Sequence, residues 1–488
     1  MPMLSPACRT FMEKVELSPF DQTMVRVFIH KLFCFPFPDP TLQAEAVEKL
    51  EQALSATILR WPFITGFVSP DESAAQQNAV KLEYDPPLSG NVGDHIFTVR
   101  NLSAPEYAWA YDQLAEAGMP LKPMDKDVFS AVPEWPAPGQ AYPALSIQAN
   151  FIEGGLILCF AFHHTVADGG SFVTFLKEFA AATKMPTRHD SAQVMPVEPR
   201  VAYAPRDGVV RNLESFPEYD YTTAPVHHDK YKEITTRILK FSAATVQKLE
   251  ADIKAELKKN PDAPSFVSNI ACLSGLIWIA VVRARYNRMP HNRLPASETT
   301  KIGIAVNARG VMTPKLPEDY FGDAVVHTNA TAKVYELLDV GEDATHALQP
   351  ISVVALALAA SRMREAVSKV DAAYVSERLK TLSSVSDVAE PCLLYTQAMD
   401  TTHTGLDFSS WRDQGADIEF GIPGIGTSTV DFWRKAWSPN EGAYNILPRK
   451  GGSKGPADWE VSLGLSMEDM DRVCSDAELG GWTSRIIE

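Results

Sequence analysis

The sequence has few cysteines and fewer basic than acidic residues. Its six cysteines are spread over 488 residues without a C-x-x-C pair, which argues against a disulfide scaffold or a zinc ribbon. The 45 Lys and Arg side chains are outnumbered by 61 Asp and Glu side chains, for a formal net charge of −16. Because so acidic a protein repels nucleic acid phosphates, we expect no nucleic acid partner.

The sequence also lacks a long apolar run and a secretory leader. The longest apolar stretch, residues 266–282, contains Ser268, Asn269 and Ser274 and is shorter than the roughly 20 residues that a bilayer requires. The segment Met1–Arg9 has no basic patch followed by an apolar run, as a secretory signal would have. We therefore expect a cytoplasmic protein with no membrane partner.

Two common catalytic motifs are missing. Residues 421–428, Gly-Ile-Pro-Gly-Ile-Gly-Thr-Ser, nearly copy a Walker A loop, but Thr427 stands where the phosphate-binding lysine is required. The segment also precedes a predicted strand instead of following one into a helix, so we interpret it as a Gly-Pro loop and not as an ATP site. No G-x-S-x-G elbow is present, so serine hydrolase chemistry has no support.

Helical and strand patterns occur in both halves of the chain. Apolar residues make up 45% and charged residues 22%, the usual mix of a folded globular protein, and the length predicts two or three domains. Apolar spacing predicts helices at 44–59, from 170 onward, and at 243–259, 266–282 and 353–382. Strands are predicted at 155–162, 302–306, 418–420, 428–432, 443–447 and 459–465.

A proline-rich segment at 185–225 separates the two halves. It carries six prolines and few apolar clusters, as expected for a long connection. We therefore predict an N-terminal lobe at 1–185, a crossover at 186–232 and a C-terminal lobe at 233–488, with part of 383–430 packing against the N-terminal lobe. Mixed helices and strands in both parts predict two α/β lobes, and ligand sites often lie between such lobes.

The densest titratable chemistry lies at residues 163–169, His-His-Thr-Val-Ala-Asp-Gly, where a buried strand breaks into a helix. Neighbouring side chains in a strand point to opposite faces, so His163 and His164 cannot both face one cavity and one of them is structural. A neutral imidazole can take a proton from a hydroxyl group. Two alternatives remain open: both histidines only stabilise the turn, or they bind a metal, which their opposed faces disfavour.

This turn resembles the H-x-x-x-D-G signature of the BAHD acyltransferases, in particular the fungal branch around trichothecene 3-O-acetyltransferase. Similar landmarks occur in order along nearly the whole chain. They lie at 17–21, 54–55, 62–66, 148–155, 277–278, 283–285, 306–309 and 316–322.

The resemblance implies a two-lobed fold like that of chloramphenicol acetyltransferase, with an active-site channel between the lobes. It implies that His164 is the general base in a ternary complex. The substrates would be acyl-coenzyme A, carrying an acetyl or another short acyl group, and a hydroxylated secondary metabolite. No permanently bound cofactor and no metal are implied, and the family precedent is a monomer.

The resemblance also implies roles for other residues. Asp168 and Gly169 would support the turn through Arg309. The segment Ser409-Ser410-Trp411 resembles the family's Thr/Ser-Ser-Trp segment, which implies that Trp411 donates its indole N–H to the tetrahedral oxyanion. Such a donor is suited to a dry site because it carries no charge. Ser409 and Ser410 would then lie beside the co-substrate.

The second family signature, D-F-G-W-G, is only partly present. Here it is Asp431-Phe432-Trp433-Arg434-Lys435, which keeps the first two residues and loses both glycines. Because glycine permits close backbone approach, a different local backbone is expected. Asp431 is predicted to be structural, and Arg434 and Lys435 are predicted to contact coenzyme A phosphates.

Two rival functions follow from this departure. In the first, the same fold takes a carrier-protein thioester, or catalyses condensation or cyclisation, without coenzyme A. In the second, the protein binds a metabolite and catalyses nothing, and the histidines only stabilise the turn.

Overall fold

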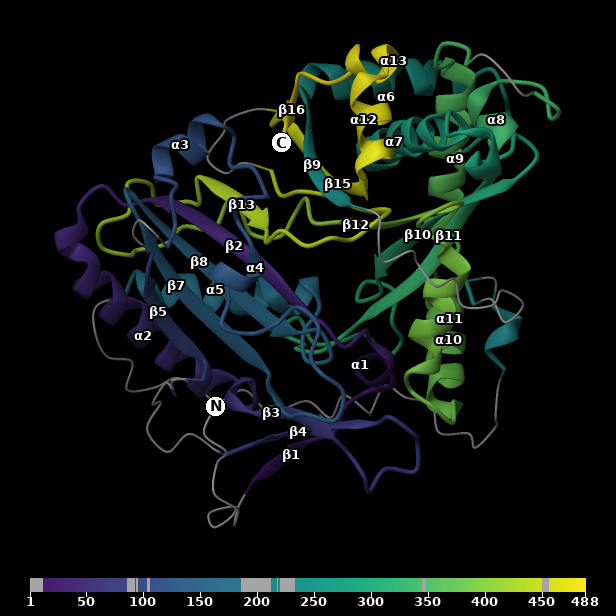
Figure 1. The fold of residues 1–488 in the computed structure, drawn as a ribbon. Coiled ribbons are helices and arrows are strands. Elements are labelled where there is room, and N and C mark those ends of the chain that lie inside the picture. The colour runs from purple at the N-terminus through teal and green to yellow at the C-terminus, as the bar shows by residue number, and fades with distance from the viewer. Residues whose placement is uncertain are drawn as a thin grey trace.

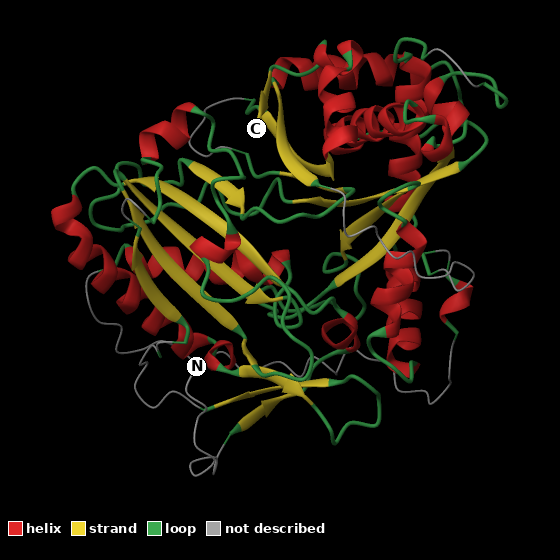
Figure 2. Cartoon of the chain, viewed as in Figure 1, coloured by secondary structure: helices red, strands yellow, loops and turns green. Residues whose placement is uncertain are grey.

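The computed structural model describes residues 12–85, 93, 95–102, 106–185, 212–216, 218–219, 233–344, 348–449 and 456–488. The chain forms two lobes, each built on a β-sheet with helices packed against it (Figures 1 and 2). The predicted crossover at 186–232 lies outside the described residues, apart from 212–216 and 218–219.

The N-terminal lobe is built on a mixed sheet with the strand order β13-β2-β8-β7-β5. Its central strands β2, β7 and β8 are almost entirely buried, as expected for a sheet covered on both faces. One face packs against helices α2 and α5, and the other against α3 and α4. The elements are β2 (Phe28–Pro36), α2 (Gln43–Arg60), β5 (Phe97–Asn101), α3 (Tyr111–Glu116), α4 (Lys126–Phe129), β7 (Leu145–Ile152), β8 (Gly155–His163), α5 (Gly169–Thr183) and β13 (Phe432–Lys435).

The C-terminal lobe contains a longer sheet with the strand order β11-β10-β12-β14-β15-β9-β16. Alternate residues of these strands pack against the helices α6, α7, α9 and α12 in one apolar cluster. The elements are β9 (Ile234–Phe241), α6 (Ala243–Leu257), α7 (Asn269–Tyr286), β10 (Thr299–Asn307), β11 (Val325–Lys333), α9 (Val353–Ser368), β12 (Gly405–Ser410), β14 (Ala443–Ile446), β15 (Trp459–Ser466), α12 (Met467–Ser475) and β16 (Arg485–Ile487).

Smaller elements complete the fold. A short sheet of order β1-β4-β3-β6 lies beside the N-terminal lobe, below the main sheet in Figure 1. Helices α10 and α11 both contribute to a smaller apolar cluster that also includes Val326 of the C-terminal sheet. The bounds are β1 (Glu13–Val15), α1 (Pro19–Thr23), β3 (Phe67–Pro70), β4 (Val80–Tyr84), β6 (Tyr142–Pro143), α8 (Val334–Leu338), α10 (Ala372–Ser384), α11 (Glu390–Met399) and α13 (Ala477–Gly480).

One segment of the C-terminal half crosses back to the N-terminal lobe. Strand β13 pairs antiparallel with β2, with Trp433 opposite Phe33 (Figure 1). Before it, Trp411, Phe420 and Val430 are buried in the N-terminal core. The two lobes are therefore joined by a shared sheet as well as by loop contacts.

The structure corrects three of the predicted elements. The single helix expected over 353–382 is two helices, because Asp371 caps the start of α10 by accepting a hydrogen bond from the Tyr374 amide. Residues 418–420 form no strand, only an isolated bridge between Glu419 and Thr429. The strand expected at 428–432 begins at Phe432, where pairing with β2 becomes possible.

Candidate active site at the junction of the lobes

The turn at residues 164–168 joins β8 to α5 and is fixed by its own side chains. Asp168 is the N-cap of α5, and its Oδ1 accepts a hydrogen bond from the Ser171 amide at 2.9 Å, as aspartate commonly does at this position. Gly170 lies against Arg309, whose Nη1 would be 2.6 Å from an added Cβ. Gly170, directly after the motif, therefore permits this close approach.

The two histidines point to different surroundings. His163 is buried at the end of β8 and packs edge-on against Phe28 of the neighbouring strand β2, with the ring centroids 5.2 Å apart. Burial, with a smaller effect of Arg26, lowers the pKa of His163 to about 3, so this ring stays neutral. The side chain of His164 is 20% exposed. His164, not His163, is therefore the histidine that a substrate can reach.

Asp168 and Arg309 form a bidentate ion pair. Arg309 Nη1 donates to Asp168 Oδ2 at 2.6 Å, and Nη2 donates to Oδ1 at 2.8 Å. Burial raises the pKa of the Asp168 carboxyl, but Arg309 and two backbone amides outweigh it, and the net pKa is lowered. Asp168 therefore remains an anion with its oxygens occupied, which fits a supporting role and not that of a base.

Sequence reasoning missed the carboxylate closest to His164. Asp323 lies in the turn between β10 and β11, and its Oδ1 is 3.4 Å from His164 Nδ1. The side chain is completely buried. The only available signal was its position directly after the landmark at 316–322.

Sequence reasoning also missed three polar side chains of the C-terminal lobe that contact one another in series, beginning with His327, which interacts electrostatically with His164. The ring of His327 on β11 is 4.4 Å from that of Tyr395 on α11, and the Tyr395 hydroxyl donates to Asp407 Oδ1 on β12 at 3.0 Å. Burial, with a smaller effect of His164, lowers the pKa of His327 to about 4. His327 therefore adds an uncharged imidazole to the surroundings of His164, and it contacts the hydroxyl–carboxylate pair through Tyr395.

Trp411 lies in the N-terminal core and is 7% exposed. Its ring packs edge-on against Trp433 at 5.3 Å, with the ammonium of Lys31 5.6 Å from its centroid. The indole N–H is already donated to Ser409 Oγ at 3.0 Å. Ser410, at the end of β12, pairs with Ile446 of β14. The structure thus connects Trp411 to Ser409 directly.

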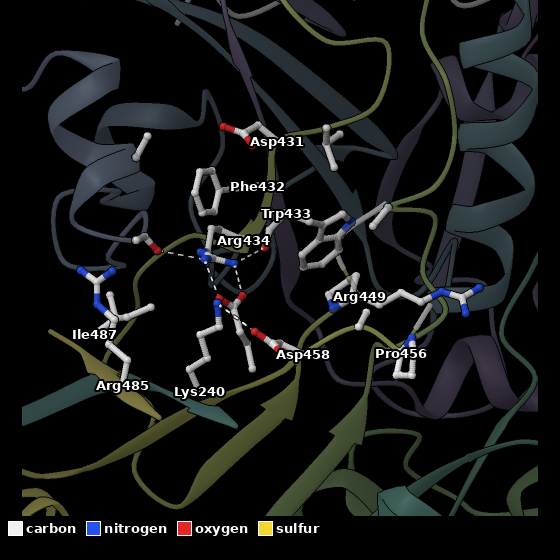
Figure 3. Close-up of a pocket in the computed structure, with 17 residues that line it drawn as sticks. Lys240, Asp431, Phe432, Trp433, Arg434, Arg449, Pro456, Asp458, Arg485 and Ile487 are labelled. Atoms are coloured by element: carbon white, nitrogen blue, oxygen red, sulfur yellow. Dashed lines mark hydrogen bonds and ion pairs between the residues drawn. The ribbon is translucent and has the colours of Figure 1, made fainter. Parts of the chain in front are cut away.

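Arg434 is buried between the lobes and is only 2% exposed. Its guanidinium donates to the carbonyls of Gly118, Met119 and Trp433 and forms an ion pair with Glu460 of β15 at 2.8 Å (Figure 3). All five of its N–H donors are engaged in these bonds. This arrangement leaves no donor for the phosphate that the sequence assigned to Arg434, because the side chain instead joins the two lobes.

Lys435 and Asp431 occupy different places beside Arg434. Lys435 lines a narrow crevice between the lobes together with Asn445 and Ser462, and burial lowers its pKa. Asp431 accepts a hydrogen bond from the Tyr111 hydroxyl at 3.1 Å, an interaction within the N-terminal lobe.

A cavity of about 650 Å³ lies around β13, β15 and β16 (Figure 3). Its wall carries Lys240, Arg449 and Arg485, which are more exposed than Arg434. Lys240 faces Asp458 at 3.3 Å and Arg449 faces Asp417 at 3.0 Å. The cavity wall therefore combines accessible cations with carboxylates.

Metal-binding and membrane-spanning features were sought in the same described residues. No three His, Cys, Asp or Glu side chains there are grouped so that they could hold a metal ion. None of the helices in this part of the chain has the length and apolar character needed to cross a membrane.

Replacing Arg434 with alanine should destabilise the protein by about 3–5 kcal/mol, because Glu460 loses its buried partner. Thermal unfolding measures the change. The matched control is Arg449→Ala, whose ion pair is solvent-exposed and should hardly alter the Tm. If the Arg434→Ala variant has an unchanged Tm and a raised KM for acyl-coenzyme A, the result would support the predicted contact between Arg434 and a coenzyme A phosphate.

Comparison with known proteins agrees with this architecture. The chain is 24% identical over 526 residues to O-acetyltransferase ptmV of Penicillium ochrochloron, covering 97% of each chain. It is 24% identical over 412 residues to trichothecene 8-O-acetyltransferase of Fusarium sporotrichioides, covering 81% of this chain and 80% of the other. The structure superimposes on F. graminearum TRI101 complexed with coenzyme A and deoxynivalenol with a TM-score of 0.78, at 20% identity, covering 98% of this chain and all of the other.

A more distant solved structure, vinorine synthase, superimposes with a TM-score of 0.57 at 17% identity, covering 97% of this chain and 98% of the other. Family models match over most of the chain. The model for a trichothecene 3-O-acetyltransferase-like N-terminal domain covers residues 27–182, and that of the Transferase family covers residues 122–479. The predicted family and two-lobed α/β fold are confirmed: the chain belongs to the Transferase family and is an acyltransferase of the BAHD type.

Proposed function

We propose that this enzyme transfers an acetyl or another short acyl group from acyl-coenzyme A to a hydroxyl of a secondary metabolite, in a ternary complex with His164 as general base. The observation that carries the proposal is the accessible imidazole of His164 at the junction of the lobes, beside an aspartate that is fully engaged with Arg309. Relatives named as O-acetyltransferases support the reaction class.

Acyl-coenzyme A as co-substrate is supported by similar folds. Structures of TRI101 were solved with coenzyme A together with deoxynivalenol or T-2 mycotoxin, and another with ethyl coenzyme A. These complexes favour coenzyme A over a carrier-protein thioester for this chain too. We further propose that the enzyme acts as a cytoplasmic monomer, with lobes at 1–185 and 233–488 joined by the crossover at 186–232.

In the proposed reaction, Nε2 of His164 removes the proton from the acceptor hydroxyl as its oxygen attacks the thioester carbonyl. The C–S bond then breaks, and the imidazolium returns the proton to the departing thiolate. No acyl-enzyme forms. General base catalysis of this kind contributes about 10²–10⁴ in rate, or roughly 3–5 kcal/mol of the barrier.

The oxyanion requires a donor near the thioester carbonyl, and we assign it to the pair of Trp411 and Ser409. Because the indole N–H is donated to Ser409 Oγ, the serine hydroxyl can turn its own hydrogen toward a ligand, and the indole N–H polarises it. Trp411 then acts directly or through Ser409. Ser410 adjoins this pair on β12.

The phosphates of coenzyme A need accessible cations. Arg434 has no donor left, so we transfer this role to Lys240, Arg449 and Arg485 around the cavity in Figure 3. Lys435 lies in the crevice between the lobes, where the pantetheine arm would pass on its way to His164.

The His164→Ala variant should lose about 10²–10⁴ of kcat, because the acceptor hydroxyl loses its proposed general base. Release of free coenzyme A from acetyl-coenzyme A, with deoxynivalenol as trial acceptor, measures the rate. His291→Ala, on the exposed surface, is the matched control and should retain full activity. Full turnover by His164→Ala would reject the mechanism.

The Trp411→Phe variant tests the oxyanion donor. Phenylalanine keeps the aromatic packing but removes the N–H, so kcat should fall on the order of 10- to 100-fold. This loss is at or below the roughly 10²–10³-fold loss of kcat that follows the removal of one oxyanion-hole donor. Trp135→Phe, at a tryptophan that is 61% exposed, is the control. If kcat of Trp411→Phe equals that of the wild type, the indole is only a packing residue.

A further inference from the structure

The turn that carries Asp323 is held by side chains of the other lobe. Gly322 donates its amide to Ser171 Oγ at 2.9 Å, and its carbonyl accepts from Ser171 Oγ and from Arg309 Nη2, both at 2.8 Å. Ser171 belongs to α5, directly after the His164 turn. The backbone at Gly322 is thus tied to the helix that follows the catalytic histidine.

The next two amides are held in the same way. The Asp323 amide donates to Asp21 Oδ1 at 2.8 Å, and the Ala324 amide donates to Asp168 Oδ2 at 2.9 Å. Asp21 itself is fixed in a capping box with Ser18 at the start of α1. Three consecutive residues of the turn therefore bond to three side chains of the N-terminal lobe, which leaves the Asp323 backbone little freedom.

This fixed backbone directs the Asp323 carboxylate at His164. Oδ1 lies 3.4 Å from Nδ1. Both carboxylate oxygens and Nδ1 are buried, and among the described residues none of these three atoms makes a well-aligned hydrogen bond to any group. A buried carboxylate without hydrogen bonds is costly, so its most favourable partner is the imidazole that it faces.

We propose that Asp323 is the positioning residue of His164: its carboxylate keeps the imidazole proton on Nδ1, so that the Nε2 lone pair faces the acceptor hydroxyl. When Nε2 takes the proton, the same carboxylate stabilises the imidazolium. The motif residue Asp168 acts through this arrangement, because it holds the Ala324 amide and Arg309 and thereby the turn. The inference rests on the proposed role of His164 and adds its orienting partner.

The electrostatics agree with such a pair. Burial raises the pKa of Asp323 to about 7. For His164, burial lowers the pKa, but Asp323, with a smaller effect of the ring's own backbone carbonyl, outweighs it and the net pKa is raised above 6.5. Among the described residues, the other charged or titratable groups around the pair are Asp21, Asp168, Arg26, Arg309, His163 and His327.

The sign of the pH dependence follows from this pair. A raised pKa keeps His164 protonated to higher pH, so the base form and the rate should rise with pH through a midpoint above 6.5. Removing the carboxylate charge destabilises the imidazolium, and the midpoint should move to lower pH.

The Asp323→Asn variant tests the proposal. We expect kcat to fall on the order of 10- to 100-fold, because a misoriented His164 would lose part of the rate enhancement that general base catalysis supplies. The KM for acetyl-coenzyme A should be unchanged. The acid limb of the rate profile should shift to lower pH. In the His164→Ala background the same substitution should cost almost nothing further, because both residues act in one step. Equal losses in both backgrounds, or an unshifted profile, would overturn the proposal.

The matched control is Asp469→Asn, which removes another buried carboxylate, the partner of Arg288 in the C-terminal lobe. It should lower the Tm without shifting the pH midpoint. This separates a general loss of stability from a change at His164.

Carbethoxylation of His164 by diethyl pyrocarbonate gives a second readout that requires no acyl transfer. The full chain is labelled across pH 5–9 and the modified peptide is quantified by mass spectrometry. The wild-type midpoint should lie above 6.5 and that of Asp323→Asn below it. A wild-type midpoint at or below 6.5 overturns the proposal even if the variant does not fold. If Asp323→Asn shifts the labelling midpoint but the His164→Ala enzyme is fully active, the proposed function is refuted and the pairing of Asp323 with His164 stands.

Discussion

The buried ion pair between Asp168 and Arg309 is the interaction on which the site depends. Asp168 comes from the turn before α5 and Arg309 follows β10, so the pair spans the two lobes. An unpaired buried charge is strongly unfavourable, and either residue alone would leave one. The pair therefore fixes the His164 turn and the 322–324 turn against each other.

Other contacts between the lobes serve the same end. Arg434 joins the 118–119 loop to Glu460, and strand β13 completes a sheet that begins in the other half of the chain. Because His164 and Asp323 come from different lobes, small changes in the relative position of the lobes alter the distance between them. The loss of both glycines from the second signature is consistent with this packing, since Trp433 fills buried space and Lys435 lines the crevice between the lobes.

The sequence allowed the local part of the site to be predicted. The strand ending at His163, the turn and the start of α5 follow from an apolar run, an aspartate N-cap and two glycines, all within 25 residues. The break between α9 and α10 was missed because apolar spacing continues through Asp371 while its capping role does not show in that spacing. Asp323 and His327 were missed because they come near His164 only through the tertiary pairing of distant strands, and Tyr395 was missed because it meets His327 in the same way. Arg434 was assigned to a phosphate because its partners, the carbonyls of residues 118 and 119 and Glu460, are distant from it in the sequence.

The return of β13 to the N-terminal sheet also shapes how the protein is made. The ribosome releases β2, β7 and β8 early, but the strand that covers the edge of β2 is supplied by residues 432–435, near the end of synthesis. Until then β2 presents an unpaired, apolar edge, a surface on which nascent chains aggregate. The first lobe thus cannot be completed during translation before the second is nearly finished, and a fragment ending after α5 would expose that edge permanently.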